Sequence, residues 1–340
     1  MSKKLSGIVV VIVLIILAVE GYFLFQTYRG GVKKYTGPME TITLGVETSL
    51  LPSLVWVAQN QGYFAENGVE VALKEFDSGR AAFTAMLNEG GLDMVTVAQT
   101  PVMFNSFNRN DFAIVSAMVS SYNDVFVLAR RDRGITKPRD LRGKKIGVTM
   151  GSTGQYYLGL FLSNAGLELA EVNQVDIKTG DLVKSLEQGT VDAISTWQPH
   201  IYNAEKALGD NAITFPTRKI FREDFYFVPN RQFLQNNPEE IARFLQALTQ
   251  AEDFINKNKD EAIDIVSQRL ALEKDFVASV WDDFQFGLFL DNTIVQTIEE
   301  EAQWAIQNKL TDKTEVPNYQ NYISLTALQQ AAPEKVLITK

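Results

Sequence analysis

The 340-residue chain contains no cysteine and a single histidine, His200. The missing thiols exclude a thiolate nucleophile, cysteine-ligated zinc, a disulfide framework and a lipid-modified N-terminal cysteine. One imidazole cannot build a metal site that needs two or three histidine ligands. His200 follows a proline at an expected helix start without triad partners around it, so a capping or surface role is favoured over that of a base. The sequence therefore predicts neither a metal nor another cofactor.

Positive charge is also scarce, with 32 Lys and Arg residues against 41 Asp and Glu residues and a net charge of −9. Proteins that bind nucleic acids carry clustered Lys and Arg, so this acidic balance argues against a nucleic-acid partner. Hydrophobic residues make up 46% of the chain, which is typical of a globular protein. The length suffices for two domains of ordinary size.

A long hydrophobic run is present at the N-terminus, where residues 8–19 are uninterruptedly apolar and an apolar, aromatic stretch continues after Glu20 to Phe25. The uninterrupted run has the length of a signal-peptide core, whereas the whole segment is just long enough for a membrane span. Because Val19-Glu20-Gly21 is a poor cleavage site, an uncleaved anchor is favoured over a cleaved export signal. Residues 1–40 are therefore expected to be a membrane-targeting segment and a linker outside the globular body.

From residue 41 onward short apolar strands alternate with helices, which is typical of a mainly parallel sheet flanked by helices. The alternation restarts near residue 146, after a turn-rich segment, and gives way after residue 230 to an almost wholly helical pattern. Asn237-Pro238 marks the start of a helix with one apolar face. The chain therefore divides into two α/β regions followed by helices.

Two extended segments, residues 124–129 and 224–229, are expected to pass between these two regions. The predicted first lobe comprises residues 41–123 and 228–340, and the predicted second lobe comprises residues 124–227. The C-terminal helices are expected to pack back on the first lobe.

The stretch Gly151-Ser152-Thr153-Gly154 lies between a predicted strand and a predicted helix. Unpaired N–H groups and the dipole at a helix start suit phosphate, sulfate, sulfonate or carboxylate, and the two hydroxyls add donors. The alternative is an ordinary Ser or Thr helix cap with glycines for close packing. The stretch matches neither the P-loop nor the dinucleotide-binding glycine pattern.

Five blocks that span most of the body, about residues 41–337, point to a family. These blocks resemble the substrate-binding proteins of ABC importers for nitrate, sulfonates, taurine and thiamine precursors. They read GYFAENGVEV (62–71), GLDMVTVAQTP (91–101), ITKPRDLRGKKIGVTMGSTGQYYL (135–158), LEQGTVDAISTWQP (186–199) and NPEEIARFLQALTQAEDFI (237–255).

The resemblance implies a type II periplasmic-binding-protein fold, with two α/β lobes of mainly parallel sheet joined by a two-segment hinge. It also implies a non-catalytic receptor that binds a small polar or anionic ligand, such as a sulfonate, taurine or nitrate, between the lobes. The receptor would deliver that ligand to an ABC permease and its ATPase. Its body would lie in the periplasm or extracytoplasmic space, anchored to the cell membrane or released there after cleavage.

Ligands of open α/β sheets bind beyond the carboxyl ends of the strands, and the resemblance points to the same place. The residues expected to bind the ligand follow five predicted strands: Ser49, Leu51, Gly79, Arg80, Gln99, Thr100, Gly151, Ser152, Thr153, Trp197 and Gln198. Many relatives have an acidic residue at the position of Gln198. This chain departs from that pattern, so the resemblance does not imply a ligand that needs a carboxylate at this position.

Three side chains at the predicted site have a functional and a structural interpretation. Arg80 either forks onto an oxyanion or is a solvated residue at a helix start. Glu47 either pairs with an ammonium group of a zwitterion such as taurine or is an exposed charge at a strand end, and the second is favoured. Trp197 either stacks on the ligand or belongs to the core.

Two other functions are compatible with the same fold. One is an enzyme, such as a thiamine-precursor synthase or a chorismate-dehydratase-like enzyme; the membrane-targeting segment and the missing cysteine argue against it. The other is a membrane-tethered ligand sensor, but no segment resembling a signalling output follows the body.

Overall fold

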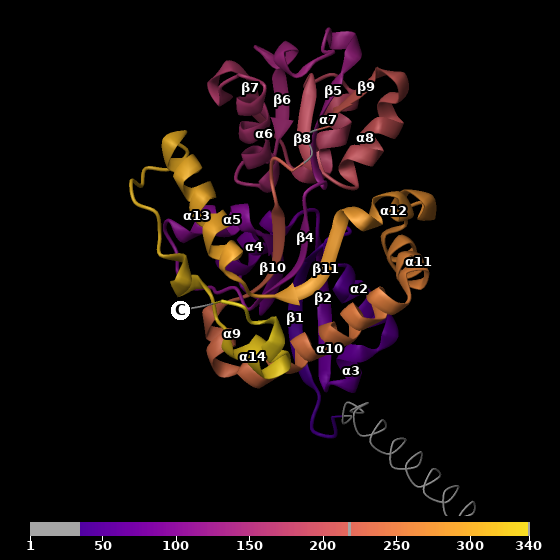
Figure 1. The fold of residues 1–340 in the computed structure, drawn as a ribbon, viewed down its shortest axis with the longest axis vertical. Coiled ribbons are helices and arrows are strands. Elements are labelled where there is room, and N and C mark those ends of the chain that lie inside the picture. The colour runs from indigo at the N-terminus through magenta and orange to yellow at the C-terminus, as the bar shows by residue number, and fades with distance from the viewer. Residues whose placement is uncertain (1–34, 217–218, 339–340) are drawn as a thin grey trace, which may run out of the picture.

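Two β-sheets, one above the other in Figure 1, divide the chain into two lobes. The computed structural model describes residues 35–216 and 219–338. The first sheet has the strand order β11 (Phe284–Phe289), β4 (Ser116–Ser121), β10 (Glu223–Pro229), β3 (Met94–Ala98), β1 (Glu40–Glu47) and β2 (Val69–Phe76). The second has the order β7 (Asn173–Asp176), β6 (Lys145–Val148), β8 (Ala193–Trp197), β5 (Val125–Arg130) and β9 (Ala212–Phe215).

Both sheets are mixed rather than mainly parallel. Strand β1 pairs in parallel with β2 and β3, and β6 pairs in parallel with β7 and β8. Strand β10 is antiparallel to β3 and β4, and β5 is antiparallel to β8 and β9. Strands β5 and β10 each enter their sheet from the other lobe without a helical crossover, so they run against their neighbours.

The chain crosses between the lobes at two places, between β4 and β5 and between β9 and β10. The first crossing is residues 122–124, directly before the expected segment. The second expected segment, 224–229, is instead part of β10, which pairs with β3 and β4 of the first sheet. The second crossing therefore precedes residue 223, and the predicted lobe boundary at residue 227 falls within a strand of the first sheet.

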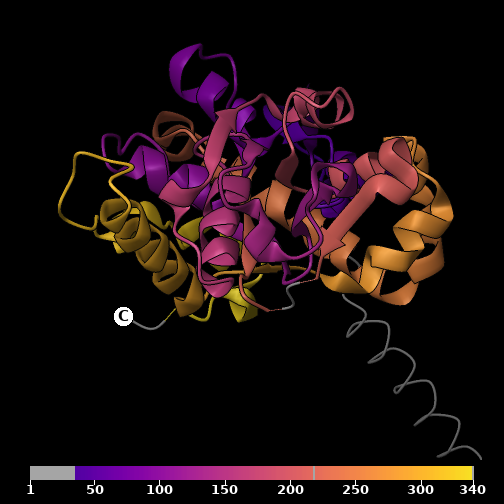
Figure 2. The same cartoon turned by 90° about the horizontal axis from the view of Figure 1, so that it is seen from above.

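Helices cover both sheets. In the first lobe they are α2 (Ser53–Gln61), α3 (Tyr63–Glu66), α4 (Gly79–Asn88), α5 (Gln99–Ser106), α9 (Arg231–Asn236), α10 (Pro238–Lys257), α11 (Lys259–Leu270), α12 (Lys274–Val280), α13 (Asn292–Gln307) and α14 (Thr326–Ala331). In the second lobe they are α6 (Thr153–Asn164), α7 (Leu182–Glu187) and α8 (His200–Leu208). Figures 1 and 2 show α13 on one side of the molecule and α11 and α12 on the other.

The predicted helical periodicity identifies the buried face of α10. Ile241, Phe244, Leu245, Leu248 and Ile255 on that face are all buried in the core of the first lobe. The C-terminal helices thus pack on the first lobe, as predicted.

The structure differs from the sequence pattern at two places. The sequence of residues 51–68 predicts one helix closed by Gly68, but the segment forms α2 and α3, because Gly62 adopts a left-handed φ of 76° between them. Strand β11 was not predicted in the almost wholly helical C-terminal region, although Phe284, Phe286 and Leu288 of its sequence FQFGLF alternate as in a strand.

No described helix is long and apolar enough to cross a membrane. The predicted membrane-targeting run, residues 8–25, lies outside the described residues.

Candidate functional site

A small cavity lies where the two lobes meet. It has a volume of about 10 Å³, which is room for roughly one water molecule. The first lobe lines it with Glu47, Gly79, Arg80, Ala98, Pro101, Glu223 and Phe225, and the second lobe lines it with Ser152, Thr153 and Trp197. Several of these residues end a strand or follow one directly, which agrees with the rule for ligand sites in open α/β sheets. The lobes are therefore closed around the cavity.

Glu47, the last residue of β1, joins the lobes at this cavity. Its side chain is only 2% exposed. The carboxylate accepts hydrogen bonds from the backbone N–H of Gly79 at 2.6 Å and from the indole Nε1 of Trp197, in the other lobe, at 2.7 Å. Burial raises the pKa of Glu47 from 4.5 to about 7, although both hydrogen bonds favour the charged form. The prediction that Glu47 is an exposed strand-end charge is wrong.

Contacts on two sides of the cavity also hold the lobes together. On one side, Tyr202 of α8 stacks on Phe276 of α12 with 3.9 Å between ring centroids, and its hydroxyl donates to Glu273 Oε2 at 2.6 Å. On another, Tyr156 of α6 packs edge-on against Trp304 of α13 with 4.9 Å between centroids. Contacts between the lobes well outside the cavity therefore also stabilise the closed arrangement.

The loop at the start of α6 faces Arg80 across the cleft. A Cβ atom on Gly151 would lie 3.2 Å from Arg80 Nε. Gly151 also has a left-handed φ of 72°, so the loop needs glycine there for conformation and for close approach. A Cβ atom on Gly154 would lie 2.6 Å from the backbone oxygen of Ser195, which explains the second glycine by packing.

Three donors of this loop are already used inside the second lobe. Ser152 is the N-cap residue of α6, but its hydroxyl makes no capping bond and donates to the backbone oxygen of Thr149 at 2.6 Å. The N–H of Gly151 donates to Gln155 Oε1 at 2.8 Å, and that of Ser152 donates to Thr149 at 3.2 Å. The loop is therefore not a simple side-chain cap, and its capacity to bind an anion is smaller than its sequence indicates.

Two further carboxyl groups lie at the crossings between the lobes. Asp124 precedes β5, Glu223 begins β10, and each is 2% exposed. Asp124 Oδ1 accepts the N–H of Gln198 at 3.3 Å. Asp124 Oδ2 and Glu223 Oε2 are buried without a donor from any other described residue, and the two carboxyl groups are hydrogen-bonded to each other, with Glu223 keeping the proton. Burial raises the pKa of Asp124 to about 7, and burial together with the charge of Asp124 raises the pKa of Glu223 well above its usual range.

The predicted site residues separate into two groups. Gly79, Arg80, Ser152, Thr153 and Trp197 line the cavity, and Gly151 lies against Arg80. The other five lie in the surrounding framework: Ser49, Leu51, Gln99, Thr100 and Gln198.

Hydrogen bonds show what three of these framework residues do. Ser49 Oγ accepts the N–H of Leu51 at 3.3 Å. The Gln99 side chain holds the start of β10, since it donates to the backbone oxygen of Arg222 at 2.7 Å and accepts from the N–H of Asp224 at 2.9 Å. Gln198 Oε1 accepts the N–H of Tyr202 in the first turn of α8 at 3.2 Å. These residues shape the cleft without lining its cavity.

Several residues at the cleft were not predicted from the sequence. These are Asp124 and Glu223, together with Ala98, Pro101 and Phe225, which complete the cavity lining. The sequence contains a signal for three carboxyl groups of the cleft: Glu47, Asp124 and Glu223 each adjoin an apolar strand sequence. A charge is costly to bury there, so such a residue is a candidate for a functional role.

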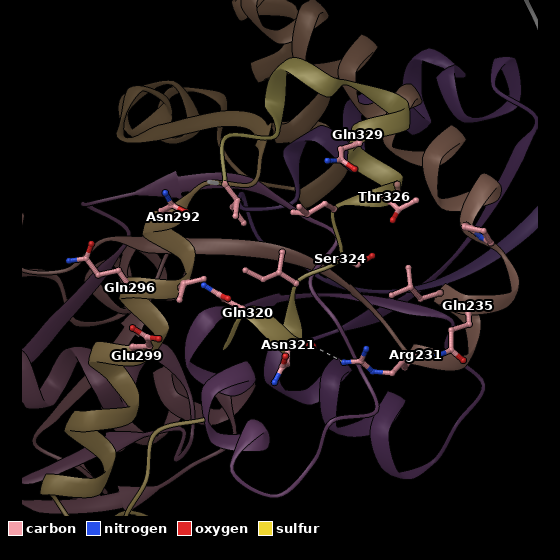
Figure 3. A pocket seen from close by; sticks show the side chains of 17 residues that line it. Arg231, Gln235, Asn292, Gln296, Glu299, Gln320, Asn321, Ser324, Thr326 and Gln329 are labelled. Atoms are coloured by element: carbon pink, nitrogen blue, oxygen red, sulfur yellow. Dashed lines mark hydrogen bonds between the residues drawn. The ribbon is translucent and has the colours of Figure 1, made fainter. Parts of the chain in front are cut away.

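A larger hollow lies elsewhere on the first lobe (Figure 3). It has a volume of about 1070 Å³, and the side chains labelled in Figure 3 come from α9, α13 and the C-terminal segment. Most of them are neutral amides and hydroxyls. Arg231 donates to the backbone oxygens of Asn110, Phe112 and Asn321 and is thus committed to the fold. The cleft, where buried carboxylates converge from separate elements, is the better candidate site.

No group of three or more His, Asp or Glu side chains among residues 35–216 and 219–338 is arranged to hold a metal ion.

Two α/β lobes closed over a cleft at the carboxyl ends of their strands define a protein of the periplasmic-binding-protein fold. A family model described as NMT1/THI5 like matches residues 53–262, and the chain belongs to this family.

Curated relatives include binding proteins. The chain is 26% identical over 280 residues to a Bacillus subtilis (strain 168) protein provisionally described as an aliphatic sulfonates-binding protein, covering 81% of this chain and 83% of the relative. It is 23% identical over 223 residues to the taurine-binding periplasmic protein of Escherichia coli (strain K12), covering 64% and 68%. Homologues of this chain thus include periplasmic binding proteins.

Solved structures show the same fold. The alkanesulfonate-binding protein SsuA from Xanthomonas axonopodis pv. citri, bound to MOPS, superimposes with a TM-score of 0.74 at 16% identity, covering 85% of this chain and all of SsuA. Enzymes also share the fold or the family. The 4-amino-5-hydroxymethyl-2-methylpyrimidine phosphate synthase THI13 of Saccharomyces cerevisiae (strain ATCC 204508 / S288c) is 25% identical over 217 residues, covering 59% and 62%.

Proposed function

We propose that this protein is the solute-binding component of an ABC importer and that its small polar ligand binds in the cleft between the lobes. The observation that carries the proposal is the cavity lined from both lobes, where Arg80 of the first lobe meets the 151–153 loop of the second. Its homologues among sulfonate-type and taurine-type binding proteins support the same function. A permease and its ATPase are the partners that this function requires.

The side chains of the cleft do not form an arrangement typical of a catalytic nucleophile and base, so we expect binding without turnover. The hydroxyl of Ser152 donates to a backbone carbonyl instead of to a base. His200 packs edge-on against Trp197, and burial lowers its pKa. Because some enzymes share this fold, the alternative that this protein is an enzyme needs an experimental test. A thermal-shift screen with sulfonates, taurine, nitrate, bicarbonate, pyrimidines and flavins, followed by calorimetry, should give one site and unaltered recovered ligand; altered product would contradict the proposal.

Substitutions on either side of the cleft should weaken binding of the strongest ligand from that screen. Arg80→Gln removes a guanidinium; because hydrogen bonds to charged groups contribute about 1.5–3 kcal/mol, this variant should bind ~10-fold to 100-fold more weakly in calorimetry. The double change Ser152→Ala with Thr153→Ala removes two hydroxyls, of which that of Ser152 is bonded to Thr149, so its loss of affinity should be smaller, about tenfold or less. The double variant should also lose about 1 kcal/mol of stability, since Ser152 bonds Thr149.

The control is Arg131→Gln, which removes an exposed arginine of the second lobe, away from the cavity. This control should bind like the unmodified protein. Unchanged affinity in both cleft variants, with folding intact, would place the ligand outside this cleft.

We also propose that residues 1–40 hold the body at the outer face of the membrane, because the apolar run has a poor cleavage site. Intact mass of protein extracted from membranes should include the initial segment, apart from removal of Met1. A mature N-terminus near Tyr22 would instead show cleavage and release to the extracytoplasmic space.

A further inference from the structure

We propose that Asp124 and Glu223 form a proton-dependent contact between the lobes, which stabilises the closed arrangement in mildly acidic solution and is lost as pH rises. This inference concerns the control of lobe closure and goes beyond the proposed function. It applies to the ligand-free protein and does not depend on which ligand the cleft binds.

The two carboxyl groups are held by different lobes, although both lie at the crossings. Asp124 is tied to the second lobe, because its backbone oxygen and its Oδ1 both accept the N–H of Gln198 at 3.3 Å. Glu223 begins β10 and pairs with Ser121 in the first sheet. The Gln99 side chain holds the backbone on either side of Glu223. A bond between these two carboxyl groups therefore joins one lobe to the other.

A proton makes this contact attractive. Asp124 and Glu223 are hydrogen-bonded to each other, and Glu223 keeps the proton. Two carboxyl groups can form such a bond only while at least one of them is protonated, since a carboxylate is an acceptor without a donor. When both are charged, the same contact becomes repulsive. Each side chain is 2% exposed, so water screens little of that repulsion in the closed form.

The surroundings of the pair oppose a second negative charge. The charged side chains around it are Glu47, Arg80, Arg222, Asp224 and Asp283. Glu47 and Asp283 add negative charge near Asp124, and Glu47 does the same near Glu223. Arg222 is bonded to Asp224 at 2.9 Å. Among the described residues one cation, Arg80, lines the cavity beside Glu223, and it is only half-buried.

Opening of the lobes would relieve this cost. The closed cavity has a volume of about 10 Å³, room for roughly one water molecule, whereas an open cleft admits water to the carboxylates. Their pKa values should therefore be higher in the closed form than in the open form, so the closed form binds more protons and loses stability as pH rises. Asp124 has a pKa of about 7, and that of Glu223 is raised well above its usual range, so the bonding proton is lost last. The contact should hold at pH 6 and weaken toward pH 9.

Spin labels can report the separation of the lobes, because the chain has no cysteine of its own. Thr84→Cys on α4 and Lys184→Cys on α7 place one label on an exposed residue of each lobe. Double electron–electron resonance on the full-length, ligand-free protein should show the ratio of closed to open molecules falling about tenfold or more from pH 6 to pH 9, since one pKa unit corresponds to a factor of ten. A distance distribution that does not change with pH would overturn the inference.

A variant at the pair separates its effect from that of other carboxyl groups. Glu223→Gln, made in the labelled protein, keeps a donor for Asp124 but has no proton to lose. It should abolish most of the response and keep the lobes closed at pH 9. Glu89→Gln, an exposed control at the end of α4, should retain the full response. A full response in Glu223→Gln would show that the pair is not its source.

Asp124→Asn covers the case in which Glu223→Gln does not fold. The asparagine amide can donate to Glu223 after that carboxyl has lost its proton, so the response to pH should again shrink. Circular dichroism at pH 6 and pH 9 checks that each labelled protein is folded. An undiminished response in Asp124→Asn would contradict the inference and leave the importer function standing, because no ligand takes part in these measurements. Failure of the ligand screen would count against the proposed function alone.

Discussion

Glu301→Gln is expected to raise the melting temperature of the ligand-free protein at pH 8 by several degrees. Glu301 on α13 is 1% exposed, and neither of its carboxyl oxygens has a hydrogen-bond partner among the described residues. Burial raises the pKa of Glu301 well above its usual range, and the nearby Thr100 hydroxyl and Gln99 amide offset only part of that effect. Glutamine has no proton to lose, so the substitution removes the cost of keeping Glu301 protonated at pH 8, which is about 1.4 kcal/mol for each unit by which its pKa is raised. Each kcal/mol corresponds to roughly 2 °C in a protein of this size.

The pH dependence follows from the direction of these shifts. A carboxyl whose folded pKa is raised keeps its proton in the folded state after the unfolded chain has lost it, so stability falls as pH rises from the unfolded pKa through the folded one. The folded pKa is about 7 for Glu47, Asp124 and Asp224, and burial raises the pKa values of Glu223 and Glu301 well above their usual range. The melting temperature of the unmodified protein should therefore decrease between pH 5.5 and pH 8.5.

Calorimetric scans across this pH range separate the contribution of Glu301. Glu301→Gln should flatten the decline, and Glu89→Gln, an exposed glutamate at the end of α4, should leave it unchanged. A melting temperature that rises with pH, or an equal effect of the two variants, would show that Glu301 is not the source.

Trp197→Phe is expected to loosen the closed form and to weaken ligand binding by ~10-fold to 100-fold. The substitution keeps an aromatic ring but removes the N–H that Glu47 accepts from the other lobe at 2.7 Å. One buried oxygen of Glu47 then lacks its donor whenever the lobes are closed, which costs about 1–3 kcal/mol. In the open form water can hydrate that oxygen, so the cost falls mainly on closure.

Small-angle scattering measures closure directly. The ligand-free Trp197→Phe variant should have a larger radius of gyration than the unmodified protein, and saturating ligand should reduce the difference. Trp281→Phe is the control, because Trp281 is buried in the first-lobe core and packs on Phe286. An unchanged radius and an unchanged affinity in the Trp197 variant would contradict a role for this hydrogen bond in closure.

The sequence by itself determined the family and most of the local structure. The alternation of apolar strands and helices predicted nearly every element between residues 41 and 257, because periodicity along the chain reflects burial. It also located the loop at Gly151 and the helix-start arginine Arg80, which the structure brings together across the cleft. A few consecutive residues were enough to predict this loop, since the end of a strand followed by small residues is a local sequence pattern.

Only the tertiary structure decided the direction of β5 and β10 and the electrostatic character of the cleft. Strand direction depends on where the chain enters a sheet, and this was misjudged because β10 belongs to the first sheet instead of crossing between the lobes. Glu47, Asp124 and Glu223 lie far apart in the sequence, so their shared burial and raised pKa values arise from the tertiary arrangement of the two lobes. Desolvation acts through space rather than along the chain, and for that reason a glutamate that reads as an exposed strand end becomes a buried contact between the lobes.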